Sequence, residues 1–231
     1  MTDDMRTERL LSTVELVQSR GDPELGKLCI MSLVARLLAE PHGDHPAAAS
    51  PLIAAFARPV NDAMDRRTRQ RLIPFAPRIS GTRAEADAAR REVLHEALMR
   101  DILPHLVTDL QVAATCETDA DAAEATSRLA GVLYETEPAE QPYTVQDPTW
   151  DHAALIAPLR VAVTAHRDGS GIQQAEAIAR LLIAGASRVA RPSRRMWYWD
   201  RAVDIMDRLC DVPDAPRSRP ETEDRRATAV A

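Results

Sequence analysis

The feature that most constrains the fold is an uncharged run at residues 28–35, which reads LCIMSLVA. No charged residue lies between Lys27 and Arg36, so a helix through this run is apolar on nearly all sides. Such a helix is stable only where other elements surround it. The sequence therefore predicts a buried central helix over about residues 23–40.

Helical spacing of apolar residues continues through most of the chain, and the two-residue alternation of strands is absent. Only 3% of the residues are aromatic, which favours packed helices over a β-sandwich. Prolines inside helical segments, such as Pro59 and Pro158, are expected to kink them. We predict an all-α fold, an irregular multi-helix bundle of about nine or ten helices around the 23–40 helix.

Local signals indicate several helix ends. A first helix is expected over about residues 4–20, because Gly21 suits the position after a helix. Ser50 followed by Pro51 indicates a helix start, since serine caps free N–H groups and proline needs no partner in the first turn. Asp65 is expected to cap a short helix in the same way.

One helical domain is predicted over residues 1–212. Residues 136–150 carry three prolines and no helical spacing, which indicates a linker or a long surface crossover. A second lobe at 151–212 is therefore the open alternative. Residues 213–231 hold little that could be buried and are expected to be a disordered tail.

The overall charge and composition limit the class of protein. The formal net charge is −6 at pH 7, which disfavours nucleic acid as a partner because the phosphate backbone requires positive surface. No apolar run reaches the ~18 residues of a membrane span, and the polar start is not a signal peptide. The three cysteines are far apart, as expected of buried free thiols in a reducing compartment. We expect a cytoplasmic protein without a cofactor, and attribute its arginine and alanine content to a GC-rich bacterial genome.

A short polar loop could hold a metal ion. His42, Asp44 and His45 lie between two prolines, and imidazole and carboxylate are ordinary zinc or iron ligands. Neighbouring loop residues seldom ligate an ion alone, so a distant ligand such as Asp62 would be needed. The competing interpretation is a solvated loop.

Polar residues near Pro59 form a second candidate site. Asn61 and Asp62 follow the proline, and polar side chains at a helix bend can line a pocket. Arg78 and Arg83, in an arginine-rich stretch from residue 66 to residue 83, could bind an anionic ligand through their guanidinium groups. The competing interpretation is that these residues bond to local backbone and to acidic neighbours on a solvated surface.

Two further features occur on predicted helices. Glu92 and His95 have the i, i+3 spacing of di-iron helical proteins, but a second such pair is absent from the sequence, so an exposed surface pair is expected. Trp197 lies on the polar side of the last helix together with Arg201. A tryptophan there either packs under a neighbouring segment or anchors a partner, so both residues are interface candidates.

These observations favour a cytoplasmic helical accessory or scaffold protein that acts through protein–protein contacts, with a protein partner or a second copy of itself. No set of catalytic residues is evident, so a non-catalytic role is favoured without excluding an enzyme. The alternative is a protein that binds a small anionic molecule, or a metal-dependent hydrolase. Its pocket would be lined by the 42–45 loop and the 59–62 bend.

Overall fold

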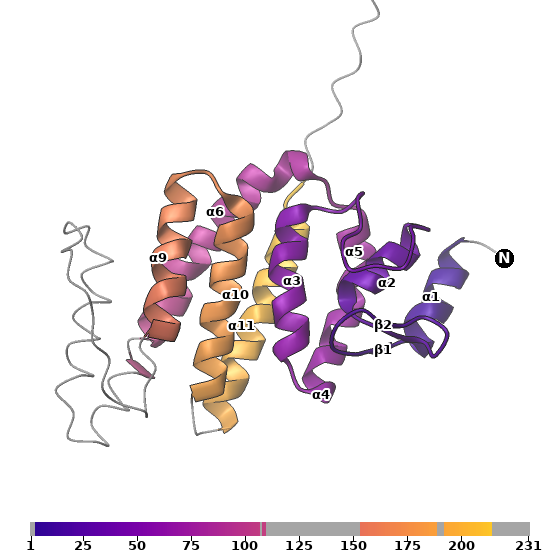
Figure 1. The fold of residues 1–231 in the computed structure, drawn as a ribbon, viewed down its shortest axis with the longest axis horizontal. Coiled ribbons are helices and arrows are strands. Elements are labelled where there is room, and N and C mark those ends of the chain that lie inside the picture. The colour runs from indigo at the N-terminus through magenta and orange to yellow at the C-terminus, as the bar shows by residue number, and fades with distance from the viewer. Residues whose placement is uncertain (1–2, 107, 110–152, 189–191, 214–231) are drawn as a thin grey trace, which may run out of the picture.

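The fold is predominantly helical, as the sequence predicts. The computed structural model describes residues 3–106, 108–109, 153–188 and 192–213 (Figure 1). The α-helices with defined bounds are α1 (Asp3–Thr13), α2 (Ile30–Leu37), α3 (Pro51–Ala63), α4 (Arg66–Arg69), α5 (Ala76–Ser80), α6 (Asp87–Ala97), α9 (Ala153–Arg167), α10 (Gly171–Arg188) and α11 (Pro192–Asp211). Shorter turns of 3₁₀-helix or π-helix are η1 (Gln70–Phe75), η2 (Ala84–Ala86) and η3 (Leu98–Ile102).

A small sheet follows α1, and it corrects the prediction of a first helix over 4–20. Its three short strands are β1 (Glu15–Leu16), β2 (Gly21–Asp22) and β3 (Lys27–Leu28). The strand order is β1–β3–β2, with β1 parallel and β2 antiparallel to β3. The helix ends at Thr13, and the chain later turns back through Gly21, whose φ of +72° is readily available only to glycine. A Cβ atom at Gly21 would also overlap the Lys27 carbonyl group.

A distant side chain completes the backbone bonding of β1. The side-chain amide of Gln70 accepts the Leu16 N–H through Oε1 at 2.9 Å and donates to the Leu16 carbonyl oxygen through Nε2 at 2.9 Å. Leu16 and its strand partner Leu28 are both completely buried. Burial of these two leucines therefore stabilises a sheet too short to show alternation in the sequence.

Helix α2 is shorter than the predicted 23–40 helix, because Lys27 and Leu28 belong to β3. Cys29 caps it, and its Sγ accepts the backbone N–H of Ser32 at 3.3 Å. All residues of the 28–35 run are buried, as predicted. The predicted central position is wrong, however. Helix α2 contacts α3 and α5 and lies in the N-terminal part of the molecule (Figure 1).

Helix α10 lies at the centre of the described helices, where it contacts α3, α6, α9 and α11. Its buried positions are mostly small or aliphatic, which allows close approach on several sides: Ala175, Ala177, Ile178, Ala179, Leu181, Leu182, Ala184 and Ala186. Gly185 is the tightest point. A Cβ atom there would overlap the ring of Tyr198 on α11, so the absence of a side chain sets the separation of these two helices.

Some predictions concern residues that the structure does not describe. The crossover at 136–150 and the tail beyond Pro213 lie outside the described residues. The helix count, the bundle arrangement and the division into lobes stay predictions. Within the described ranges, none of the helices is both long and apolar enough to cross a membrane.

We expect Gly185→Ala to lower the free energy of unfolding by about 1–3 kcal/mol, because the added methyl group overlaps the Tyr198 ring. In a helix without such a contact, a glycine-to-alanine change would stabilise the protein by up to ~1 kcal/mol. The sign of the change in unfolding free energy therefore shows whether the contact exists. Urea denaturation measures the difference. Gly43→Ala is the control, because a Cβ there meets only the Pro41 carbonyl oxygen, at 3.8 Å. A Gly185→Ala protein as stable as wild type would contradict the close packing of α10 on α11.

Candidate functional site

Asn61 lies completely buried on α3, where its side-chain amide joins three segments of the chain. Its Oδ1 accepts the backbone N–H of Ile30, at the start of α2, at 3.2 Å. Its Nδ2 donates to the Val17 carbonyl oxygen at 2.9 Å and to Asp62 Oδ1 at 2.8 Å. The predicted ligand-binding amide is therefore hydrogen-bonded within the fold.

Asp62 is exposed and bonds to the turn between β1 and β2. Its Oδ1 accepts the backbone N–H of Ser19 at 2.9 Å, and its carbonyl oxygen accepts Nε2 of Gln18 at 2.7 Å. Ser19 has a φ of +56°, an uncommon value for a residue with a side chain. The Asp62 carboxylate thus stabilises the positive-φ conformation of Ser19 in this turn.

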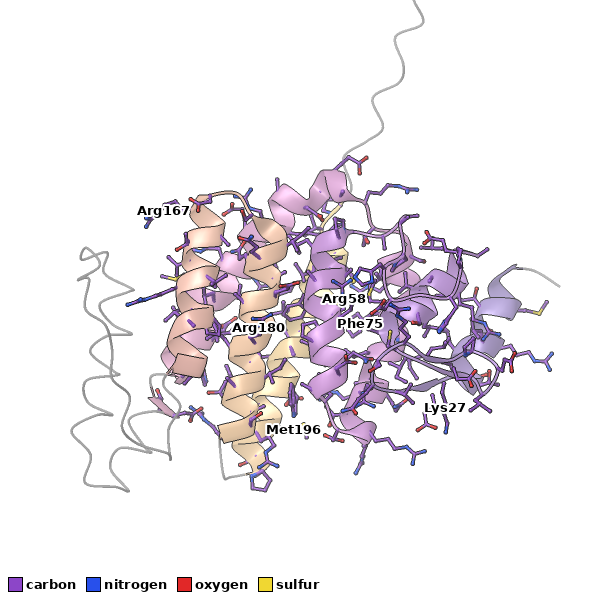
Figure 2. All side chains as sticks on the ribbon, viewed as in Figure 1. Lys27, Arg58, Phe75, Arg167, Arg180 and Met196 are labelled. Carbon is purple, nitrogen blue, oxygen red and sulfur yellow. The ribbon has the colours of Figure 1, made fainter. Side chains whose placement is uncertain are left out.

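The 42–45 loop is fixed through Asp44. Its Oδ1 lies 2.8 Å from Nδ1 of His45 and 3.3 Å from Nε of Arg20. Arg58, on α3 (Figure 2), donates to the Asp44 carbonyl oxygen at 3.3 Å. Partial burial would raise the pKa of the Asp44 carboxyl. The hydrogen bonds from His45 and its own backbone, with the charges of His45 and Arg20, outweigh burial and lower that pKa.

Among the described residues, His42, Asp44 and His45 do not form a complete set of metal ligands. There, no three His, Cys, Asp or Glu side chains are arranged to hold an ion. The loop carboxylate and the expected distant ligand, Asp62, are each hydrogen-bonded to other groups. The metal role of this loop stays a prediction.

Arg78 is paired with α11. Its guanidinium donates to Asp207 Oδ1 at 2.6 Å, to the Asp207 carbonyl oxygen at 3.0 Å and to Asp211 Oδ1 at 2.7 Å. The guanidinium carbon also lies 5.3 Å from the ring centroid of Phe75. These contacts join α5 to the end of α11, so the predicted anion-binding group already has carboxylate partners.

Arg69 and Arg83, in the same arginine-rich stretch, also make contacts within the fold. Arg69 is buried, and its guanidinium donates to the carbonyl oxygens of Asn61 and Met64 at 2.7 and 2.6 Å. Arg83 is exposed just before η2, and its carbonyl oxygen accepts Nη1 of Arg90. Arg90 is completely buried and also donates to the Leu209 carbonyl oxygen at 3.1 Å. Arg78 thus pairs with distant carboxylates rather than with acidic neighbours in the sequence, and ligand binding by Arg83 stays a prediction.

The interface candidates on α11 lie in a small aromatic cluster. The indole of Trp197 stacks on the His105 ring, with ring centroids 3.8 Å apart and planes 15° apart. It meets the Tyr198 ring edge-on at 5.0 Å, and the Arg201 guanidinium carbon lies 5.5 Å from its centroid. Trp197 remains partly exposed. The indole therefore packs against a neighbouring segment and still presents surface to solvent.

A partly buried carboxylate, Asp109, bonds to two residues next to this cluster. The Tyr198 hydroxyl donates to Asp109 Oδ2 at 2.6 Å, and Nε of Arg194 donates to Asp109 Oδ1 at 2.5 Å. Burial and the bond to Asp109 raise the pKa of Tyr198 far above its ordinary value. Arg201 in turn pairs with Asp204 at 2.8 Å. The aromatic side chains are therefore held in one geometry by charged neighbours.

A polar cluster at the junction of α6, α9 and α10 is missed by the sequence interpretation. His95 is half-buried rather than part of an exposed pair with Glu92, and its ring stacks on His166 of α9. Gln174 of α10 is completely buried beside them, with Nε2 3.4 Å from His166 Nδ1. The spacing of Glu92 and His95 concerns only neighbouring residues of one helix. It gives no information about His166, which lies 71 positions later in the chain.

The described cysteines are free thiols, as expected. Cys29 is buried at the α2 cap, and Cys210 is partly buried near the end of α11. Burial raises the pKa of the Cys210 thiol to about 11, so it stays protonated at neutral pH. Cys116 lies outside the described residues.

We expect Asn61→Ala to lower the free energy of unfolding by about 2–4 kcal/mol, because it leaves the buried N–H of Ile30 and carbonyl oxygen of Val17 without partners. Thermal and urea denaturation measure the loss. Asp62→Asn serves as the control, since an exposed amide oxygen can still accept the Ser19 N–H. If the two variants lost equal stability, the amide would not have the central role assigned to it.

Comparison with known proteins gives no relative for this chain. No family model matches it, and neither a curated protein nor a solved structure is significantly similar to it. Any functional conclusion must therefore come from the residues and contacts described above.

Proposed function

We propose that this protein is a cytoplasmic, non-catalytic accessory or scaffold protein that binds another protein, or a second copy of itself, through α11. The observation that carries the proposal is the Trp197 cluster, defined as Trp197 with His105 and Arg201. It combines a partly exposed indole with a guanidinium group, the two side chains most enriched where binding energy concentrates in protein interfaces.

Rigidity of the cluster favours binding over a purely solvated role. One side of the indole is covered by His105, whose Nδ1 bonds to the Asp101 carbonyl oxygen at 2.9 Å. Arg201 is held by Asp204, and its side chain is 27% exposed. Side chains that are already ordered lose less conformational entropy on association. The cluster is therefore pre-arranged to contact a partner.

The other candidate groups support the same role. Asn61 and Arg78 bond to the protein's own backbone and carboxylates. Groups that are already hydrogen-bonded in this way would have to exchange those bonds for a ligand, at a cost of about 1–3 kcal/mol for each one left unpaired. This cost favours a contact surface over a small-molecule site built from these residues.

The alternative, a metal-dependent or anion-binding site at the 42–45 loop, draws on one observation. His42 and His45 are both exposed, and the neighbouring Asp44 carboxyl has a lowered pKa, so the loop offers a carboxylate and imidazoles to solvent at neutral pH. Calorimetric zinc titration tests it. One equivalent bound by wild type and lost in a His42→Ala, His45→Ala double variant would favour the alternative; no binding would remove it.

We expect Trp197→Ala and Arg201→Ala each to weaken association at least ~tenfold, since loss of an interface anchor costs more than about 1.4 kcal/mol. Sedimentation velocity over a concentration series measures self-association. Quantitative affinity capture from cell extract measures binding of another protein.

Arg66→Ala is the matched control, because Arg66 is also an ion-paired arginine, with Glu15 at 2.6 Å, but lies on α4. Thermal unfolding of each variant separates lost binding from lost folding, since removal of the aromatic contacts of Trp197 alone should cost about 0.5–1.5 kcal/mol. Folded Trp197→Ala and Arg201→Ala proteins that associate like wild type would refute this interface.

A further inference from the structure

Two imidazole rings stack where α6 meets α9. The ring centroids of His95 and His166 are 3.8 Å apart and their planes differ by 8°. Nδ1 of His95 is buried, and it has no hydrogen-bond partner within the described part of the chain. Parallel imidazoles at this distance are compatible with neutral rings, whereas two imidazolium ions so close would repel each other strongly.

Arg91, one turn before His95 on α6, connects the stack to the α9–α10 turn. Its Nη2 donates to the His166 carbonyl oxygen at 3.2 Å, and its own carbonyl oxygen accepts Nε2 of Gln174 at 3.3 Å. A Cβ atom at Gly169 would lie 3.5 Å from Arg91 Nη1, and one at Gly171 would lie 2.9 Å from Arg91 Cγ. The turn at residues 168–170 therefore packs directly on the Arg91 side chain.

Gln174 makes this junction a buried polar site. Its side chain is completely buried, and its Oε1, like Nε of Arg91, has no partner among the described residues. Its Nε2 lies 3.4 Å from Nδ1 of His166. An amide in this position can donate to a neutral imidazole nitrogen, but it cannot donate to the protonated N–H that replaces it.

The charges around the stack act in opposite directions. From α6, the Arg91 guanidinium disfavours a further positive charge, while the exposed Glu92 carboxylate favours one. The turn carries Asp168, and α10 contributes the neutral Gln174. Burial is the largest influence on His95, and with the neighbouring His166 it lowers the pKa of His95 despite Glu92.

We propose that the His95–His166 stack is a pH-sensitive contact, which fastens the α9–α10 hairpin to α6 when both imidazoles are neutral and loosens on protonation. Opening the contact returns the His95 ring to water, where it binds a proton more readily. The closed junction is therefore fully stable above the ordinary histidine pKa of about 6.5. It loses stability as the pH falls below that value, because the open form then binds more protons.

Hydrogen exchange of the full chain tests this contact. Protection of the backbone amides of residues 166–174 is measured at pH 7.5 and pH 5.5, after correction for the intrinsic pH dependence of exchange. We expect protection in wild type to fall by up to roughly tenfold, because pH 5.5 lies about one unit below the ordinary histidine pKa of about 6.5. In His95→Gln and His166→Gln, which carry a neutral amide in place of one ring, the fall should be largely lost.

His45→Gln is the control, because its ring is 69% exposed on the 42–45 loop, and it should retain the wild-type response. Equal protection of wild type at the two pH values, or an unchanged fall in both stack variants, would overturn the proposal. If the variants do not fold, the ring protons of His95 are titrated by NMR in wild type. A pKa at or above the ordinary value would overturn the proposal, and a lowered pKa with loss of protection in the same pH range would support it.

Discussion

A primary amide offers two donors and an acceptor, and the fold of the N-terminal half depends on how Asn61 uses them. Its oxygen accepts the first N–H of α2, and its nitrogen donates to the Val17 carbonyl oxygen and to the Asp62 carboxylate. Because Asn61 and Ile30 are completely buried, the side-chain amide and the Ile30 N–H would otherwise lose water without replacement. The Asn61 amide therefore ties the start of α2 to α3.

The sequence predicts features whose causes are local. Ser50 and Asp65 cap α3 and α4 as expected, since a cap needs only the residue and the N–H groups two or three positions later. Burial of the 28–35 run is likewise predictable, because eight uncharged neighbours leave a helix or strand no polar side. The position of α2 in the molecule is not predictable in this way, since many helices can cover an apolar one.

Features that depend on distant residues escape prediction. The strand at Leu16 requires the amide of Gln70, 54 positions away, and Arg78 meets Asp207 across 129 positions. The polar junction of α6 and α9 likewise joins Arg91 to a backbone group 75 positions later. Composition and spacing indicate which residues could belong to a binding site. Only the fold shows that Asn61 and Arg78 are hydrogen-bonded to other groups of the protein, and that His95 stacks on His166.

The bonding of Gln70 to Leu16 has a consequence for association of the sheet. Strand β1 is an edge strand of the sheet. The backbone N–H groups of Glu15 and Val17 bond to the β3 segment, and the backbone N–H and carbonyl of Leu16 point away from it. An outward-facing N–H and carbonyl invite the strand of another molecule, which is a common origin of aggregation. Here both groups are already bonded to one side-chain amide. The side chain of Gln70 therefore occupies the backbone groups of this edge strand. While it does so, a strand of another molecule cannot pair with Leu16.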